Sequence, residues 1–223
     1  ITYYLLSVTD DVTNETSCVS TLDQSVTVTV IPTPVVNTIV DQVKCHGTSN
    51  NAVTFSGSTT NSYSWENSGL PSIGIPASGT GTILQAYPLT NTGTSPVDAM
   101  ITVTPSFTDG IVTCTGNSVS FSITVNPAAQ VNHVPNIELC NGSVSSPITF
   151  STNNTGGITT FKWTNSNPTI GLPASGNGNI NSFTATNTGN TPVVSTISVT
   201  PYFSNKGLEC TGTPITFTIT VKP

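Results

Sequence analysis

The sequence carries little charge and lacks arginine altogether. Among its 223 residues only 4 are Lys or Arg and 10 are Asp or Glu, which gives a formal net charge of −6. Such a chain has no basic patch that neutralises the phosphates of a nucleic acid. The composition therefore argues against nucleic-acid binding and against attachment to an anionic membrane surface.

Long apolar runs are also missing. No run approaches the roughly 20 residues that span a bilayer, and the first residues lack the basic segment of a signal peptide, so the sequence predicts neither feature. Thr, Ser and Asn replace the Ala, Glu, Lys and Leu that a coiled coil needs. Because 35% of the residues are hydrophobic and many are β-branched, we expect a folded β protein without membrane insertion.

What the sequence does contain is a repeat of about 96 residues, a period that has to be found before any element is assigned. The segment SIGIPASGTGTI at residues 72–83 recurs as TIGLPASGNGNI at residues 169–180. Likewise, CTGNSVSFSITVNP at residues 114–127 recurs as CTGTPITFTITVKP at residues 210–223. The repeat predicts two complete modules, residues 33–127 and 128–223.

Residues 1–32 resemble the end of a module. Cys18 is followed by SVTVTVIP, which matches the way both complete modules run from a cysteine to a proline. We expect these residues to be the C-terminal strands of a preceding, truncated module in a longer array. A naturally truncated start is the alternative.

Each module shows the pattern of an all-β sandwich, with short alternating segments between clusters of Gly, Pro, Asn and Ser. In residues 119–125, apolar side chains alternate with Ser and Thr, as in a strand with one buried face. Further strands are expected at residues 52–56, 62–66, 83–87 and 97–104. The glycine-rich PASGTG and PASGNG segments predict exposed connections. The predicted fold is a tandem, extended array of immunoglobulin-like β-sandwich modules.

One tryptophan occupies the same place in each module. Trp65 and Trp163 both stand two residues after another aromatic residue, within a predicted strand. A large apolar ring repeated in this way is typical of a core residue. We therefore expect Trp65 and Trp163 to anchor the two cores.

Five cysteines indicate a disulfide framework. Cys45 and Cys114 are repeated as Cys140 and Cys210 at nearly the same spacing, which predicts one bridge inside each module, Cys45–Cys114 and Cys140–Cys210. Cys18 matches Cys114 and Cys210, so we expect it to be unpaired by truncation. Lasting disulfides indicate an oxidising, extracellular or cell-surface setting. Zinc is disfavoured because there is no CxxC motif and the two His residues are not at equivalent positions.

Residues with catalytic chemistry do not follow the repeat. Lys44 corresponds to Leu139 and His46 to Asn141, and no ionisable residue recurs at an equivalent position. No Ser–His–Asp pattern is present, and the GxG of PASGTG lacks the helix that a phosphate site requires. The sequence thus predicts no catalytic, cofactor-binding or metal site, and a protein that is not an enzyme.

Glycan binding is the other chemistry that a β-sandwich often carries, through exposed aromatic rings. Most aromatic residues fall at equivalent module positions, as expected of core residues. Tyr202 stands outside this pattern. We take Tyr202 and Tyr87 as the candidate ligand contacts.

The motif set IGLPASGNGNI, SFTATNTGNTPVVSTISVTP, CTGTP and ITFTITVKP resembles the PKD-like, immunoglobulin-like repeats of very large secreted proteins of Bacteroidota. The resemblance covers both complete modules. It implies a sandwich of about seven strands, export by the type IX secretion route, and membership in surface adhesins that serve attachment and gliding motility.

Two functions are compatible with these sequence features. The first is a structural stalk or fibre segment of a cell-surface adhesin, with proline-containing junctions at residues 31–34 and 126–129 and with neighbouring modules of the same chain as partners. Self-association into a filament is a variant of it. The alternative is a set of carbohydrate-binding modules, with surface glycans as partners, attached to a secreted polysaccharide-degrading enzyme.

Overall fold

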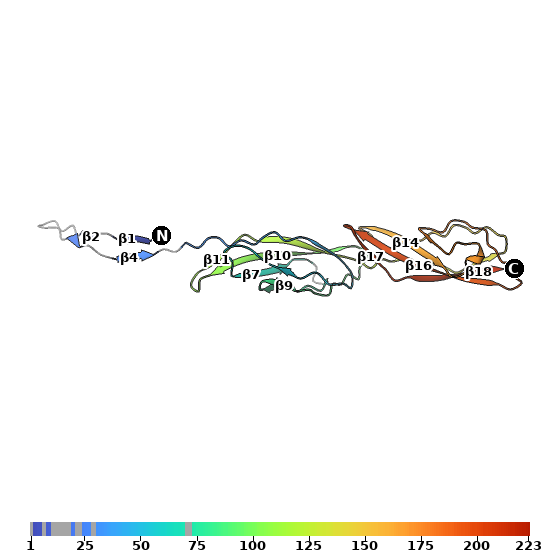
Figure 1. Ribbon diagram of the computed structural model, residues 1–223, viewed down its shortest axis with the longest axis horizontal. Helices are drawn as coiled ribbons and strands as arrows, with labels where there is room; N and C mark the ends of the chain where they lie inside the picture. The colour runs from blue at the N-terminus through green and yellow to red at the C-terminus, as the bar shows by residue number, and fades with distance from the viewer. Residues whose placement is uncertain (1, 6–7, 10–18, 21–23, 28–29, 70–72) are drawn as a thin grey trace.

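The computed structural model describes residues 2–5, 8–9, 19–20, 24–27, 30–69 and 73–223, with side chains from residue 30 onward. The regular elements of the described residues are mainly β-strands, with a short 3-10 helix at Pro168–Ile170. None of their helical residues makes a helix long and apolar enough to cross a membrane. The protein is all-β and consists of tandem immunoglobulin-like sandwiches, which we call the first module (residues 33–127) and the second module (residues 128–223) (Figure 1).

The first module has one large sheet and one small layer. The sheet has the order β5-β12-β10-β7-β8, with β11 paired to the far part of β10. Strands β5 and β12 are parallel, and the other neighbours are antiparallel. Strands β6 and β9 pair in the opposite layer. The bounds are β5 Gln42–Cys45, β6 Val53–Thr54, β7 Ser62–Asn67, β8 Ser78–Thr80, β9 Ile83–Leu84, β10 Val97–Thr108, β11 Thr113–Thr115 and β12 Val119–Asn126.

The second module repeats this topology. Its sheet has the order β13-β18-β16-β14-β15, with β17 paired to β16, and β13 runs parallel to β18. Isolated bridges, Val144 to Thr184 and Ile148 to Ile180, replace the small paired layer. The bounds are β13 Ile137–Cys140, β14 Ile158–Asn165, β15 Ser175–Asn177, β16 Val193–Asn205, β17 Leu208–Thr211 and β18 Ile215–Lys222.

Residues before the first module contain two short antiparallel pairs. Strand β1 (Thr2–Leu5) pairs with β4 (Gln24–Thr27), and β2 (Val8–Thr9) pairs with β3 (Val19–Ser20). Cys18 lies outside the described residues. Its predicted unpaired state therefore stays a prediction.

Each module has its own core, and its tryptophan lies in it. Trp65 is 4% exposed and Trp163 6% exposed, each on the inward face of a strand whose side chains alternate between buried and exposed. Burial of one large aliphatic or aromatic side chain stabilises a fold by about 1.5–3 kcal/mol. Two clusters, each with fourteen buried apolar residues, therefore give each sandwich its own source of stability.

The glycine-rich segments are largely exposed, as predicted, but their central residues form short edge strands, β8 and β15, instead of plain connections. Strand β8 pairs with β7, and β15 pairs with β14. A Cβ atom on Gly79 would lie 2.4 Å from Cζ2 of Trp65, and one on Gly176 would lie 2.3 Å from Cζ2 of Trp163. Glycine is needed here because the edge strand closes directly over the indole ring.

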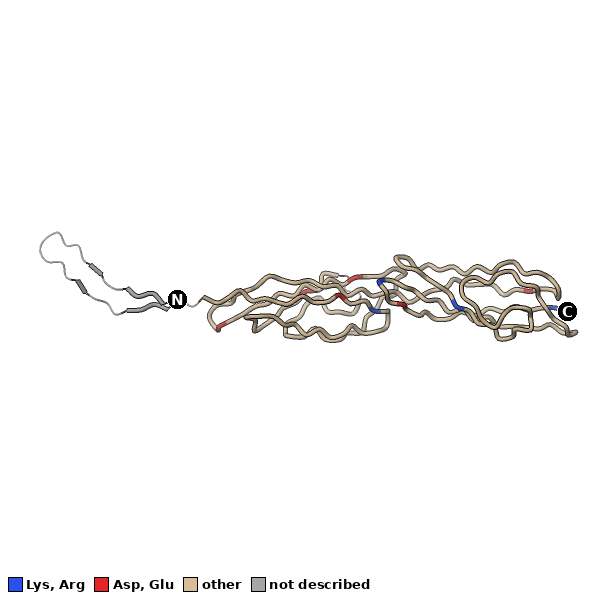
Figure 2. The backbone as a smooth tube through the Cα atoms, turned by 45° about the horizontal axis from the view of Figure 1, so that its top comes forward, with Lys and Arg blue, Asp and Glu red and all other residues tan. Residues whose placement is uncertain are grey.

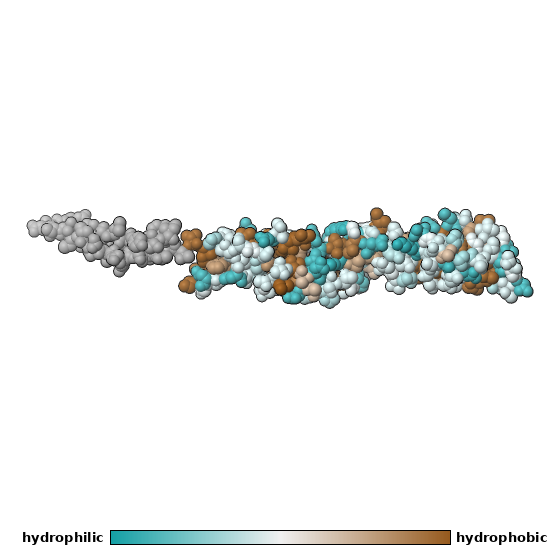
Figure 3. All heavy atoms as spheres, in the orientation of Figure 1, coloured by the Kyte–Doolittle hydropathy of each residue, from teal (hydrophilic) through white to brown (hydrophobic). Residues whose placement is uncertain are grey.

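The two modules lie end to end along the long axis of the molecule (Figure 1). Charged residues are sparse along both, and both signs occur near the place where the modules meet (Figure 2). The visible surface is mostly hydrophilic or neutral, with separate apolar patches (Figure 3). The two modules therefore contact each other at a junction between their ends.

Candidate functional site

The junction is a packed interface in which the linker itself is buried. Asn126 is 0% exposed, and Pro127 and Ala129 are buried as well. At the start of the first module, Pro32, which corresponds to Pro127, is exposed, whereas Pro34, which corresponds to Ala129, is buried. The segment between the modules is therefore part of the folded structure and differs from a flexible tether.

A disulfide bond closes the junction. Cys45, the last residue of β5, is bonded to Cys210 on β17, with 5.6 Å between their Cα atoms and 165 residues between them in sequence. Among the described residues, Cys114 is a half-buried free thiol and Cys140 an exposed one. The predicted pairings Cys45–Cys114 and Cys140–Cys210 were wrong, because the bridge joins the two modules.

Strand register explains the correction. Cys45 lies opposite Asn126, at the end of the first module that meets the junction. Cys114 lies opposite Phe107, near the other end of the long strand β10. At roughly 3.3 Å per residue, the register separates the two cysteines by about 35 Å along the sheet, whereas a disulfide requires Cα atoms within about 7 Å. A bridge inside the module is geometrically excluded.

The hairpin β16–β17 carries the second module's contacts to the first. Asn205 pairs with Leu208, which leaves Lys206 and Gly207 as a two-residue turn with φ values of 47° and 77°. Positive φ at both positions is the geometry of a type I′ turn. Lysine rarely adopts a positive φ, so we expect the contacts of the Lys206 side chain to stabilise this conformation.

Those contacts join polar groups across the junction. The Asn205 side-chain amide donates to Oδ1 of Asn126 at 2.9 Å, and Nζ of Lys206 donates to Oγ1 of Thr124 at 2.8 Å. Lys206 also lies 3.6 Å from Asp98, but both side chains are more than half exposed, so this ion pair contributes at most about 1 kcal/mol. Loss of the hydrogen bond to the buried Asn126 would destabilise the junction more than loss of this ion pair, because leaving a buried amide unpaired costs about 1–3 kcal/mol.

A loop of the second module makes a further set of contacts with the first. The backbone N–H of Thr155 donates to the carbonyl of Thr94 at 2.8 Å. The side-chain amide of Asn154 lies 3.3 Å from the same carbonyl and 3.2 Å from that of Ala128 in the linker. This loop and the β16–β17 hairpin are separate elements. The junction is therefore held by more than one element, which opposes bending.

The two candidate ligand residues lie in different modules and in different settings. Tyr87 is half-buried and packs against the first core, so its ring serves the fold. Tyr202 is half-buried on β16, and Nζ of Lys162 lies 4.4 Å from the centroid of its ring. A shallow groove of 330 Å³ includes Tyr202, Lys162 and Asn177. The structure therefore keeps Tyr202 as a surface candidate and places Tyr87 in an architectural role.

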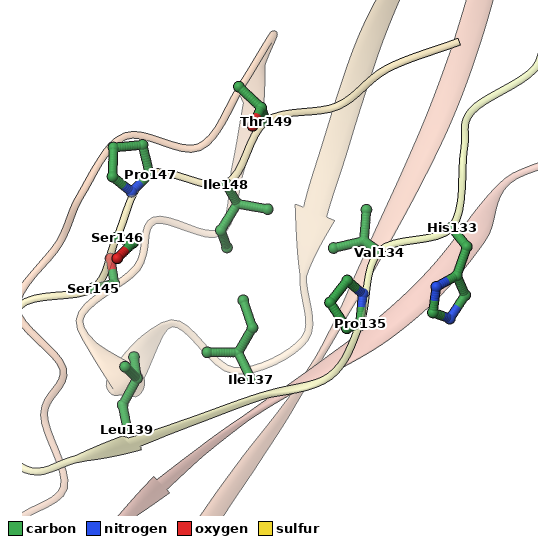
Figure 4. Close-up of a pocket in the computed structure, with 10 residues that line it drawn as sticks. All are labelled: His133, Val134, Pro135, Ile137, Leu139, Ser145, Ser146, Pro147, Ile148 and Thr149. Carbon is green, nitrogen blue, oxygen red and sulfur yellow. The ribbon is translucent and has the colours of Figure 1, made fainter. Parts of the chain in front are cut away.

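A second groove of 370 Å³ opens on the side of the second module (Figure 4). It is lined largely by apolar side chains, among them Ile137, Leu139 and Ile148. The hydroxyl of Ser145 accepts the backbone N–H of Phe183 at 3.0 Å and is thus engaged in the fold. In the described part of the chain, no three His, Cys, Asp or Glu residues gather where they could hold a metal ion.

Comparisons with known proteins add a likeness of fold. No family model and no curated protein matches the sequence. Among solved structures, extracellular cadherin domains 3–6 of protocadherin gamma B2 match with 11% identity over 92% of this chain and a TM-score of 0.45. The insect immune protein hemolin matches with 12% identity over 97% of this chain and a TM-score of 0.38. The chain spans 55% of each of these two structures.

A third similar structure is a SusE-like, surface-located polysaccharide-binding protein from the Bacteroides thetaiotaomicron heparin utilisation locus. It matches with 8% identity over 85% of this chain and 34% of its own length, with a TM-score of 0.30. At such identities and scores the likeness concerns the fold alone.

Proposed function

We propose that this chain is a non-catalytic structural segment of a large cell-surface protein, in which stacked modules provide reach and stiffness. The observation that supports this most is the junction. It is buried, hydrogen-bonded by more than one element, and closed by the Cys45–Cys210 bond. A pair of modules that only needed to be tethered would not require any of these features.

The disulfide also suits the chain to bear load. A pulling force that enters before Cys45 and leaves after Cys210 passes through the bond between them. The residues enclosed by that bond are covalently bypassed, and they include most of both sandwiches. Only the short segments outside the bond are free to extend under force, so the pair of modules resists stretching even where hydrogen bonds yield.

The finer identity follows from the resemblance described above. We propose PKD-like modules of a secreted, cell-surface adhesin or filament of Bacteroidota, exported by the type IX route and used for attachment or gliding motility. The boundaries at residues 33 and 128, and residues 1–32 as the end of a preceding module, belong to the same proposal. A lasting disulfide is in keeping with an extracellular location.

Small-angle X-ray scattering of the full chain tests the proposed stiffness. The oxidised protein should give a large maximum dimension and a distance distribution typical of a rod. The Cys45→Ser/Cys210→Ser variant should give a broader distribution, because the hydrogen bonds alone then hold the junction. A compact particle with the modules side by side would overturn the stalk proposal.

Glycan binding is a second candidate, and the setting of Tyr202 favours it. A half-buried ring beside a lysine and an asparagine offers stacking and hydrogen bonding in one groove. A glycan array with the full chain tests this function. Binding that is lost in Tyr202→Ala but kept in Tyr87→Phe would support it, and the absence of binding by the unmodified chain would remove it.

A further inference from the structure

Cys140 occupies in the second module the place that Cys45 occupies in the first. It ends β13 opposite Lys222 of the parallel strand β18, as Cys45 ends β5 opposite Asn126 of β12. Cys45 is bonded across the junction, whereas Cys140 is an exposed free thiol. The end of the second module therefore presents a free cysteine at the position where the first module has a cysteine bonded to its neighbour.

The surface around Cys140 differs from its counterpart around Cys45 in two ways. Lys222, opposite Cys140, forms an ion pair with Glu138 of β13. The position of Asp98 is also taken by an apolar residue. Where the first module has Asp98 facing Lys206, the second has Val194, which is 55% exposed. At the position of Val194 this end lacks the carboxylate that receives Lys206, and the nearby Glu138 carboxylate is already paired with Lys222. The exposed Val194 would pack better against an apolar hairpin tip than against a lysine.

The first module carries a hairpin tip of that kind. Its β10–β11 hairpin corresponds to β16–β17, and at the tip Ile111 is 94% exposed and Val112 52% exposed. Cys114 follows on β11, at the position that Cys210 holds on β17. A module of the first type, meaning one with the sequence of the first module, therefore has both an apolar hairpin tip and a cysteine. Their arrangement is the one that a partner for the end of the second module beside Cys140 requires.

We propose that Cys140 forms a second inter-module disulfide with a further module of the first type stacked after the second one. The partner is that module's cysteine at the position of Cys114. This inference rests on the proposed stacking function and extends it, because every junction of such an array would then be closed covalently.

The bridge forms by two thiol–disulfide exchanges with a low-molecular-weight disulfide such as oxidised glutathione. The Cys140 thiolate attacks one glutathione sulfur, which forms a mixed disulfide and releases one glutathione thiolate. The partner thiolate then attacks the Cys140 sulfur and releases the second. In total, two protein thiols are oxidised to one disulfide and oxidised glutathione is reduced to two glutathione molecules.

The test extends the full chain by a copy of residues 33–127 joined directly after Pro223. That joint reproduces the spacing of Pro127 and Ala128 at the observed junction. After equilibration with reduced and oxidised glutathione, a non-reducing digest is analysed by mass spectrometry. The expected result is a peptide that links Cys140 to the copy's cysteine at the Cys114 position, lost in Cys140→Ser.

Two readings in the same digest separate the possible failures. If the Cys45–Cys210 peptide is present while Cys140 reacts with maleimide as a free thiol, the inference is overturned and the stalk proposal stands. If Cys140 is linked to the copy's cysteine at the Cys45 position, the inference is likewise overturned. Circular dichroism of the extended chain, with the β signal increased by the third module, shows that the added copy has folded.

Discussion

Asn126 and Asn205 join the two modules side chain to side chain, with the Asn205 amide donating to Oδ1 of Asn126 at 2.9 Å. Asn126 is the last residue of β12 and is fully buried, although asparagine is a residue that normally stays at the surface. In the second module the same position is Lys222, which is exposed. The polar side chain is buried at Asn126 because a second module covers it.

Replacing Asn126 by Ala should weaken the junction. The change leaves the side-chain amide of the half-buried Asn205 without its acceptor. We therefore expect the free energy of unfolding to fall by about 1–3 kcal/mol. Urea denaturation monitored by tryptophan fluorescence measures it. Lys222→Ala, at the equivalent position of the second module, is the matched control and should cost far less.

Removing the bridge should destabilise the protein without unfolding it. On the chain-entropy model, a bond that encloses 165 residues stabilises by up to roughly 5 kcal/mol. The Cys45→Ser/Cys210→Ser variant should therefore have a clearly lower Tm in calorimetry under oxidising conditions. Cys114→Ser serves as the control because that thiol is free. Equal Tm values for the double variant and the unmodified chain would contradict the stabilising role.

Gly176→Ala should destabilise the second module. The new methyl group would lie 2.3 Å from the indole of Trp163, so either the edge strand β15 or the ring must move. Overpacking of this kind typically costs about 1–3 kcal/mol, which urea denaturation resolves. Gly189→Ala is the control, since its Cβ would meet only the Asn187 side-chain oxygen at an ordinary 3.4 Å. Two variants of equal stability would refute the requirement for glycine at β15.

Asp109 should titrate below the usual range. Its Oδ1 accepts the backbone N–H groups of Val112 at 2.8 Å and Ile111 at 2.9 Å, and these bonds hold its pKa below the ordinary value of 3.8. A lowered pKa means that the hairpin gains stability above that ordinary value and loses it as the pH falls through the folded pKa. NMR titration of the carboxyl carbon measures the midpoint. A midpoint above 3.8 would contradict the assignment.

Much of the fold follows from the sequence, for reasons that particular segments make plain. The alternation in residues 119–125 has a period of two, which only a strand with one buried face satisfies, and it lies within β12. The strand predicted at residues 97–104 continues to residue 108 as β10. The additional residues form the β10–β11 hairpin, where pairing with β11 rather than burial maintains the strand.

The sequence did not reveal the disulfide because the repeat spacing does not distinguish a bond within one module from a bond between two modules. Cys45 and Cys114 recur with their module, and a pairing inside the module and a pairing between modules give the same repeat. What decides between them is the parallel register of β5 and β12, which sends Cys45 to the end opposite Cys114. Residues 42–45 (QVKC) carry no clear strand pattern, so their parallel pairing with the last strand of the module, which places Cys45 at the junction, is visible only in the structure.

Single-molecule stretching of the full chain, held by its two ends, tests most directly whether the junction bond turns two modules into one load-bearing unit. In the oxidised protein, the residues between Cys45 and Cys210 should release no length. After reduction, each module of nearly a hundred residues should unfold in a step of about 300 Å, at 3.3–3.6 Å per residue. Steps of that size in the oxidised protein would contradict a covalently bypassed stalk.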